Sequence, residues 1–229
     1  MEWRRVDLSV PRLSTELTAR VWSPAEPTDD RVLVAHDGPD YDREAGLGRY
    51  AAAAVTSGRV RPFRLVLLPA GDRFEWYSCS PAYARALHAD ILPRLAGGAP
   101  VVGAGASLGA LAMLHAQRRH PVRFAGLFLQ SGSFFQPRYD RQESGFVRYQ
   151  RIVRFVRRVR RGAGAHPVPT TMTCGDVEEN LANNRSMAEA LRESGYPVSF
   201  AESSGGHAWP TWRAALDEHL TSLLQRVWR

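Results

Sequence analysis

One short run constrains the fold of this chain more than any other: residues 101–113 read VVGAGASLGALAM. An apolar β-type stretch leads into Gly-Ala-Ser-Leu-Gly, and a helical stretch follows directly. Gly105 and Gly109 flank Ser107 by two residues on either side, where side chains would collide with a tight turn. We predict that this turn presents Ser107 as a nucleophile between a strand and a helix. The alternative is a glycine-rich turn whose serine has no chemical role.

The segments around this turn alternate in a way that predicts an α/β fold with a mostly parallel central sheet flanked by helices. Two β-type segments come first, and their spacing predicts a hairpin. The predicted strands are 6–10, 17–22, 31–35, 63–68, 124–129, 168–173 and 198–201, together with the run before Ser107. The predicted helices are 46–57, 81–95, 183–194 and 212–228, together with the run after Ser107.

The chain of 229 residues, 44% of them hydrophobic, is expected to form a single domain over residues 1–229. A helical insertion interrupts the alternation at about 131–164, and it holds seven arginines between Arg148 and Arg161. An amphipathic helix with a solvated basic face explains this pattern. Two alternatives are a lid near the active site whose arginines meet an anionic substrate, and a helix that binds a membrane surface.

Charge and cysteine content exclude several classes of protein. The net charge is +7, and all 30 basic residues are arginine, yet no zinc-ligand spacing or nucleic-acid motif accompanies them. We predict no nucleic-acid partner, no metal and no organic cofactor. No apolar run is long enough to cross a membrane, and the first residues lack the apolar core of a signal peptide. With only two cysteines, we expect a cytoplasmic location.

A serine nucleophile needs a base, and the base needs an orienting acid; in one common arrangement the chain order is Ser, acid, His. His207 follows Gly205 and Gly206 after the last predicted strand, so we predict that it is the base. Three carboxylates follow the strand before that. We choose Glu178 as the acid, with Asp176 and Glu179 as alternatives.

The negative charge that develops on a substrate oxygen during such a reaction needs preorganised donors. We predict that the backbone N–H of Leu108 is one of them. The second should come from the loop at residues 36–41, after an early strand. Pro39 has no N–H, so the donor there is Asp40 or Gly38, and we choose Asp40.

Several motifs together resemble one known family. They are Asp37-Gly38 with Tyr41, the Arg73–Tyr77 segment, the Gly-Ala-Ser-Leu-Gly turn, Gly175-x-x-Glu178 followed by Asn184 and Arg185, and Gly206-His207-Ala208-Trp209 with Trp212. The chain resembles the α/β-hydrolase esterases that include enterochelin esterases, S-formylglutathione hydrolases and mycolyltransferases. In many members the residue after Asp-Gly donates to the oxyanion, and Pro39 departs from that pattern.

The resemblance implies an α/β-hydrolase fold and a serine hydrolase that uses Ser107, Glu178 and His207. It also makes Arg73 and Glu75 candidates for lining the pocket or for an ion pair near the serine turn. For contacts with the substrate we choose Arg73 and four aromatic residues, and Phe135 is a further aromatic candidate. The four chosen aromatic residues are Trp76, Tyr77, Phe134 and Trp209.

The sequence therefore predicts a serine esterase that cleaves a small-molecule carboxylic ester through an acyl-enzyme. The resemblance implies a siderophore-type ester as one candidate substrate, and the richness in arginine suits an anionic one. One alternative is an acyltransferase with the same three residues, since both reactions share the acyl-enzyme. Another is a non-catalytic binding protein that keeps the fold. The oligomeric state stays open.

Overall fold

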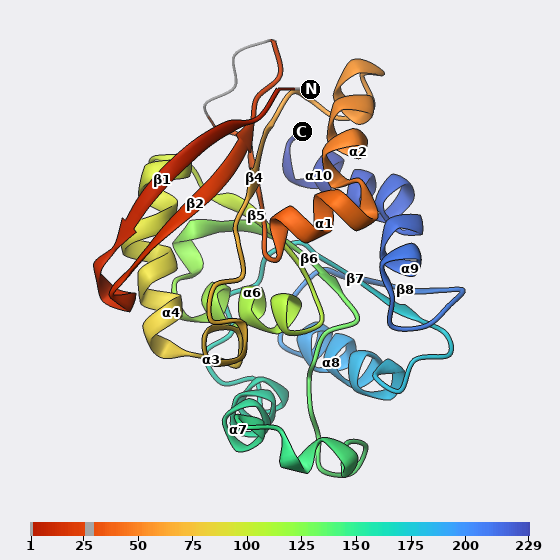
Figure 1. Cartoon of the computed structure of the whole chain (residues 1–229). Helices are drawn as coiled ribbons and strands as arrows, with labels where there is room; N and C mark the ends of the chain where they lie inside the picture. The colour runs from red at the N-terminus through yellow and green to blue at the C-terminus, as the bar shows by residue number, and fades with distance from the viewer. Residues whose placement is uncertain (1, 26–29) are drawn as a thin grey trace.

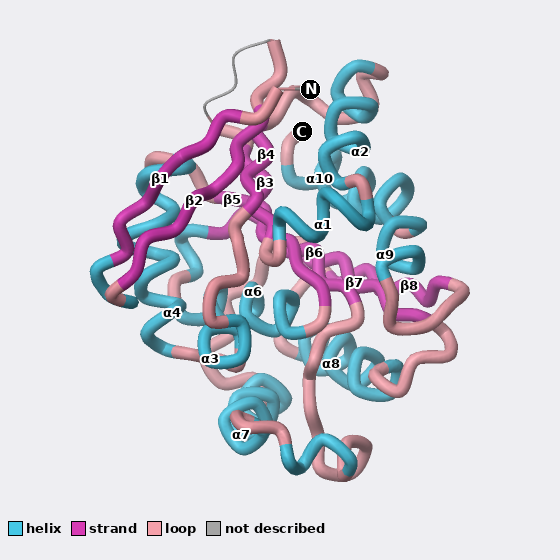
Figure 2. Tube along the Cα trace, in the orientation of Figure 1, coloured by secondary structure: helices cyan, strands magenta, loops and turns pink. Residues whose placement is uncertain are grey.

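A single twisted sheet runs through the centre of the protein (Figures 1 and 2). The computed structural model describes residues 2–25 and 30–229, and the sheet within them has eight strands in the order β1-β2-β4-β3-β5-β6-β7-β8. β1 and β2 pair antiparallel, β2 is antiparallel to β4, and the strands from β4 to β8 along the sheet are parallel. The strands are β1 (Arg4–Val10), β2 (Thr15–Trp22), β3 (Val32–Ala35), β4 (Arg64–Leu67), β5 (Val101–Ala106), β6 (Phe124–Gln130), β7 (Thr170–Gly175) and β8 (Val198–Ser203).

Helices cover both faces of the sheet (Figure 1). One core lies under α4 (Pro81–Ala86), α5 (Leu92–Ala96), α6 (Leu108–Arg119), α7 (Tyr149–Arg160) and α8 (Leu181–Glu193). The opposite core lies under α1 (Gly38–Ala45), α2 (Leu47–Thr56) and α10 (Thr221–Val227). The other helical segments are the short α3 (Arg73–Tyr77) and α9 (Trp209–Ala214), two π-helical turns (Leu87–Ile91, Leu216–Leu220) and three 3-10 turns (Pro11–Leu13, Pro121–Arg123, Gln142–Gly145).

The central strands are apolar throughout because both of their faces are buried. In β6, Leu127 and Leu129 enter the core under α6, whereas Phe128 between them enters the core under α10. Successive side chains of a strand point to opposite faces, so a strand covered on both sides needs apolar residues at consecutive positions. This burial fixes β5 and β6 in the middle of the sheet, next to the serine turn.

The order of the strands defines where a ligand can bind. The chain passes from β3 to β4 on one side, and then to β5 on the other side of β3. The connections after β3 and β5 therefore diverge and leave a crevice at the carboxyl edge of the sheet, the usual ligand site of such folds. Six parallel strands end at this edge, and the residues that follow them include Asp37, Arg73, Ser107, Ser131, Glu178 and His207.

Most of the predicted elements are present, and three predictions need correction. The predicted helix over 212–228 consists of α9, a π-helical turn at Leu216–Leu220 and α10. The predicted loop at residues 36–41 is wrong from Gly38 onward, because α1 begins there with Pro39 in its first turn, where a fixed φ favours the helix. The predicted helix over 81–95 is not regular, since a π-helical turn at Leu87–Ile91 precedes Pro93. Proline cannot donate to the helical ladder, and a local π turn accommodates that loss.

We predict that Gly105→Ala destabilises the protein by about 2 kcal/mol or more, because an added Cβ would lie 2.5 Å from the backbone of Gly109. Gly98 is the matched control, since a Cβ there meets nothing within 4 Å. Gly98→Ala should change the free energy of unfolding by less than about 0.5 kcal/mol. Urea denaturation of both variants measures the difference, and equal stabilities would contradict the close approach at Gly105.

Candidate active site

Ser107 connects the end of β5 to the start of α6, with φ of 56° and ψ of −124°. A positive φ is unfavourable for a residue with a side chain, and such strain costs on the order of 1–3 kcal/mol. Backbone hydrogen bonds hold the conformation in place. The N–H of Ser107 donates to Gln130 O (2.9 Å), and its carbonyl accepts from the N–H groups of Leu111 and Ser133, each at 3.2 Å.

His207 lies in the connection between β8 and α9, after two glycines. Gly205 has φ of 125°, a conformation that residues with a Cβ rarely adopt, and its carbonyl lies where a Cβ on Gly175 would be. The His207 Nδ1 lies 2.9 Å from Oε2 of Glu178, and the ring meets Trp212 edge-on, with centroids 5.1 Å apart. An Nδ1–H that donates to the carboxylate leaves Nε2 of the neutral ring free to accept a proton.

Glu178 is fully buried, and three donors converge on its carboxylate. Oε2 accepts from His207, while Oε1 accepts from Ser131 Oγ (2.6 Å) and from the N–H of Gly175 (2.8 Å). Burial alone would raise the pKa of Glu178, but the hydrogen bonds from His207, Ser131 and Gly175 outweigh it and lower the pKa below its usual range. The carboxylate is therefore charged at neutral pH and can orient the imidazole.

The other two carboxylates of this loop lie elsewhere. Asp176 is exposed and accepts a hydrogen bond from the N–H of Gly205 at 3.0 Å, and Glu179 is exposed. Of the three candidates, Glu178 is the one whose carboxylate contacts His207. The role of Glu178 as the acid stays a prediction, and this contact is the observation that supports it.

A cavity of about 300 Å³ opens at the serine turn. Ser107 and His207 both line it, and the hydroxyl of Ser107 has Ser133 Oγ as its hydrogen-bond partner, at 3.2 Å. A direct bond between nucleophile and base is often formed only once a substrate is bound. The cavity is lined by Asp37, Asp40, Ala70, Arg73, Ala106, Ser107, His207, Trp209 and Trp212.

The predicted oxyanion donors are the backbone N–H groups of Asp40, which lines the cavity, and of Leu108, which follows the cavity-lining Ser107. Leu108 is the first residue of α6 and Asp40 the third of α1, positions whose N–H groups have no partner within a helix. The nearby alternatives are occupied or missing, because the N–H of Asp37 donates to Tyr77 Oη (3.3 Å) and that of Gly38 to Leu68 O (2.8 Å). Pro39 has no N–H, so Asp40 is the early-loop donor left free.

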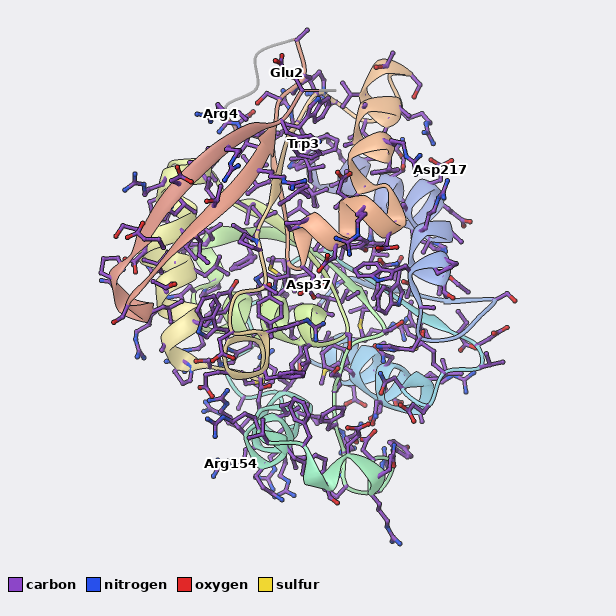
Figure 3. The ribbon with its side chains drawn as sticks, in the orientation of Figure 1. Glu2, Trp3, Arg4, Asp37, Arg154 and Asp217 are labelled. Carbon is purple, nitrogen blue, oxygen red and sulfur yellow. The ribbon has the colours of Figure 1, made fainter. Side chains whose placement is uncertain are left out.

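An ion pair closes one side of the cavity. Arg73 binds the carboxylate of Asp37 through Nε (2.9 Å) and Nη2 (3.0 Å), so Asp37 does not cap α1 with its side chain. Burial raises the pKa of Asp37, although the hydrogen bonds from Arg73 act in the opposite direction. Asp37 lies deep in the molecule, near the middle of the side-chain view (Figure 3). The guanidinium of Arg73 stays partly exposed in this pair, so a ligand in the cavity can contact it.

His36 contacts the serine turn from the interior of the protein and does not line the cavity. It is fully buried, its Nδ1 lies 3.0 Å from the carbonyl of Gly109, and its Nε2 lies 2.8 Å from the hydroxyl of Tyr83. Burial lowers the pKa of His36 to about 4, so the ring is neutral at pH 7. Nδ1–H can then donate to Gly109 O, and Nε2 can accept from Tyr83.

The predicted substrate contacts divide into two groups. Arg73 and Trp209 line the cavity, and their contact with a substrate stays a prediction. Tyr77 and Phe134 are fully buried, and Trp76 stacks on Tyr83 with centroids 5.7 Å apart, so these three pack against other side chains instead of lining the cavity. Phe135 is buried and stacks on Tyr149 of α7.

Sequence reasoning missed the residues that follow β6. Ser131 bonds the acid and Ser133 bonds the nucleophile, although neither was selected from the sequence. The signal was present, since a Ser-Gly-Ser sequence at 131–133 follows the predicted strand at 124–129 after one residue, Gln130. It could be interpreted only with the knowledge that β6 lies beside both β5 and β7.

Helix α7 of the insertion packs beside α3 and α8 and contributes no residue to the lining of the cavity. Arg151 donates to Glu75 Oε1 at 2.7 Å, and Arg148 to Glu75 Oε2 at 2.5 Å. Arg154 projects outward from α7 (Figure 3). A lid that covers the cavity therefore stays a prediction from the sequence.

Two searches of residues 2–25 and 30–229 gave negative results. No cluster of three or more His, Cys, Asp or Glu side chains there could hold a metal ion. None of the helices in the same part of the chain combines the length and apolar character needed to span a bilayer.

Known proteins share this architecture. The enterobactin esterase of Shigella flexneri, solved with enterobactin, superposes with a TM-score of 0.83 at 20% identity over 100% of this chain and 60% of that one. A ferulic acid esterase gives 0.78 at 20% identity (98% of both chains), and S-formylglutathione hydrolase from Staphylococcus aureus gives 0.70 at 14% (97% and 96%). The mostly parallel sheet and these neighbours define an α/β-hydrolase fold.

Sequence comparison narrows this class to one family. The profile of the family described as "Putative esterase" matches residues 11–223, and the chain belongs to this family. The iron(III) enterobactin esterase of Dickeya dadantii (strain 3937) is 29% identical over 220 residues, which cover 87% of this chain and 49% of that protein. The chain thus spans about half the length of this relative.

We predict that Glu178→Gln lowers kcat about 10²- to 10⁴-fold, because the amide no longer fixes the charge and tautomer of His207. It should also change how stability depends on pH. The folded pKa of Glu178 is lowered, so its stabilising effect is complete above the unfolded value of about 4.3 and is lost as the pH falls through the folded value. The stability gap between parent and variant, measured by urea denaturation, should be largest near pH 7 and shrink below about pH 4.

Glu179→Gln is the control for this experiment, since Glu179 is the exposed neighbour in the same loop. It should leave both kcat and the pH dependence of stability close to those of the parent. A loss of turnover with Asp176→Asn or Glu179→Gln, and not with Glu178→Gln, would overturn the assignment of the acid.

Proposed function

We propose that this protein hydrolyses carboxylic esters through an acyl-enzyme on Ser107. One observation carries the proposal. The strained serine of a strand–helix turn shares a cavity with His207, whose Nδ1 is bonded to a fully buried carboxylate. This constellation matches the division of labour among nucleophile, base and orienting acid in serine hydrolases.

Each residue has one task in the proposed reaction. Ser107 Oγ attacks the ester carbonyl while His207 Nε2 takes its proton, and Glu178 stabilises the resulting imidazolium. The N–H groups of Leu108 and Asp40 hold the oxyanion. His207 then gives the proton to the leaving alcohol, and the C–O bond to that alcohol breaks.

Water completes the cycle in the same site. His207 removes a proton from the water as it attacks the acyl carbon, and Ser107 leaves with that proton restored. An acyltransferase would use a different alcohol or an amine at this step, and a binding protein would not form the acyl-enzyme.

The substrate class that we propose is a small-molecule ester, including esters that carry an anionic group. The guanidinium of Arg73 is partly exposed at the cavity, and Trp209, which packs on Tyr41 and Trp212, offers an apolar wall. Related esterase structures were solved in the presence of enterobactin and of 2,3-dihydroxy-N-benzoyl-serine, and an ester of this type is our first candidate. We also propose that the protein is located in the cytoplasm.

We expect the purified protein to hydrolyse short-chain p-nitrophenyl esters, and Ser107→Ala to lower kcat at least 10³-fold, because the attacking oxygen is removed. A fluorophosphonate probe should label the parent and leave Ser107→Ala unlabelled. Turnover and labelling that persist in Ser107→Ala would contradict the proposal. If the probe labels the protein but product forms only after an alcohol or amine acceptor is added, the protein is a transferase.

A further inference from the structure

A second hydroxyl lies against the proposed nucleophile. Ser133 Oγ is 3.2 Å from Ser107 Oγ, and Ser133 is only 3% exposed. The two residues also meet through their backbones, since the N–H of Ser133 donates to the carbonyl of Ser107. Ser133 has no role in the chemistry described so far, although it touches the reacting oxygen.

The turn that carries Ser133 is fixed on several sides. Asn184 is fully buried and makes two hydrogen bonds to Gly132, accepting from its N–H (2.9 Å) and donating to its carbonyl (3.0 Å). A side chain on Gly132 would meet the buried ring of Phe134 at 2.2 Å, so glycine is required there. Ser131 has φ of 47° and is held by Thr173 O at 2.7 Å. Ser133 is therefore presented at a defined position.

The direction of the Ser107–Ser133 hydrogen bond follows from what each hydroxyl can do. A buried hydroxyl needs an acceptor for its proton, and within residues 2–25 and 30–229 the hydroxyl of Ser133 has one hydrogen-bond partner, Ser107 Oγ. Ser107 has a second acceptor available when it turns toward the cavity, because His207 lines the same space. Both hydroxyls have an acceptor for their protons when Ser133 donates to Ser107 Oγ and Ser107 donates to His207.

We propose that the Ser133 hydroxyl donates a hydrogen bond to Ser107 Oγ and positions this oxygen for attack, with the proton of Ser107 left for His207. The inference rests on the proposed esterase function. As the proton of Ser107 moves to His207 Nε2 and the Oγ–carbon bond forms, negative charge passes through Oγ, and a donor aimed at Oγ becomes stronger. The same donor assists the departure of Oγ when water cleaves the acyl-enzyme.

Three substitutions separate this role from packing. Ser133→Ala removes the hydroxyl, Ser133→Cys keeps the volume with a weak donor, and Ser133→Thr keeps the hydroxyl. We expect about a 10-fold loss of kcat in the Ala and Cys variants, with KM for a p-nitrophenyl ester within twofold of the parent value. The second-order rate of fluorophosphonate labelling should fall by the same factor. The Thr variant should recover most of the lost kcat.

Ser194→Ala is the matched control, since Ser194 also makes a short hydrogen bond, to Ala190 O, at the end of α8 and away from the cavity. Its kcat and melting temperature should equal those of the parent. Parental kcat in Ser133→Ala, or full activity in Ser133→Cys, would overturn the role of Ser133. A fall in kcat that comes only with a lower melting temperature would assign Ser133 to packing. Persistence of activity in Ser107→Ala would instead refute the esterase proposal itself.

Discussion

The backbones of β5 and α6 approach so closely at Gly105 and Gly109 that neither the strand nor the helix can shift without the other. Ser107 between them has a positive φ, and this turn lies at the crevice that the strand order leaves. The strain of on the order of 1–3 kcal/mol is offset by the packing of α6, most of whose residues are buried. His36 adds a hydrogen bond to Gly109 from beneath, so the turn is fixed from two sides.

The buried charge of Glu178 places a second demand on the fold. A carboxylate removed from water is costly unless donors replace its hydration. Ser131, Gly175 and His207 supply those donors, and Ser131 in turn accepts from Trp212 Nε1 at 2.8 Å. Residues at the carboxyl ends of three neighbouring strands, and one residue of α9, are thereby linked to one carboxylate by hydrogen bonds. The orientation of His207 therefore depends on the packing of all of these elements.

The sequence predicted those parts of the site that depend on local backbone rules. The turn at Ser107 and the glycines before His207 are determined by steric limits that a few consecutive residues reveal. Glu178 was chosen from its position three residues after Gly175, but local rules leave Asp176 and Glu179 as alternatives because both lie within two residues of it. Ser133 could not be found in this way, since its contact with Ser107 exists only when β5 and β6 pair.

The sequence predicted the arginine-rich helix but not the contacts that its arginines make. Helix α7 was predicted from its apolar spacing, and Ile152 and Val156 are indeed buried. One alternative had its arginines meet a substrate, yet Arg151 donates to Glu75 Oε1 in the middle of α3 and to the carbonyl of Ser78 just after that helix. Because α3 begins with Arg73, which binds Asp37 at the cavity, the influence of α7 on the site passes through ion pairs on α3. The insertion thus contacts α3 next to the cavity wall, from a position outside the cavity.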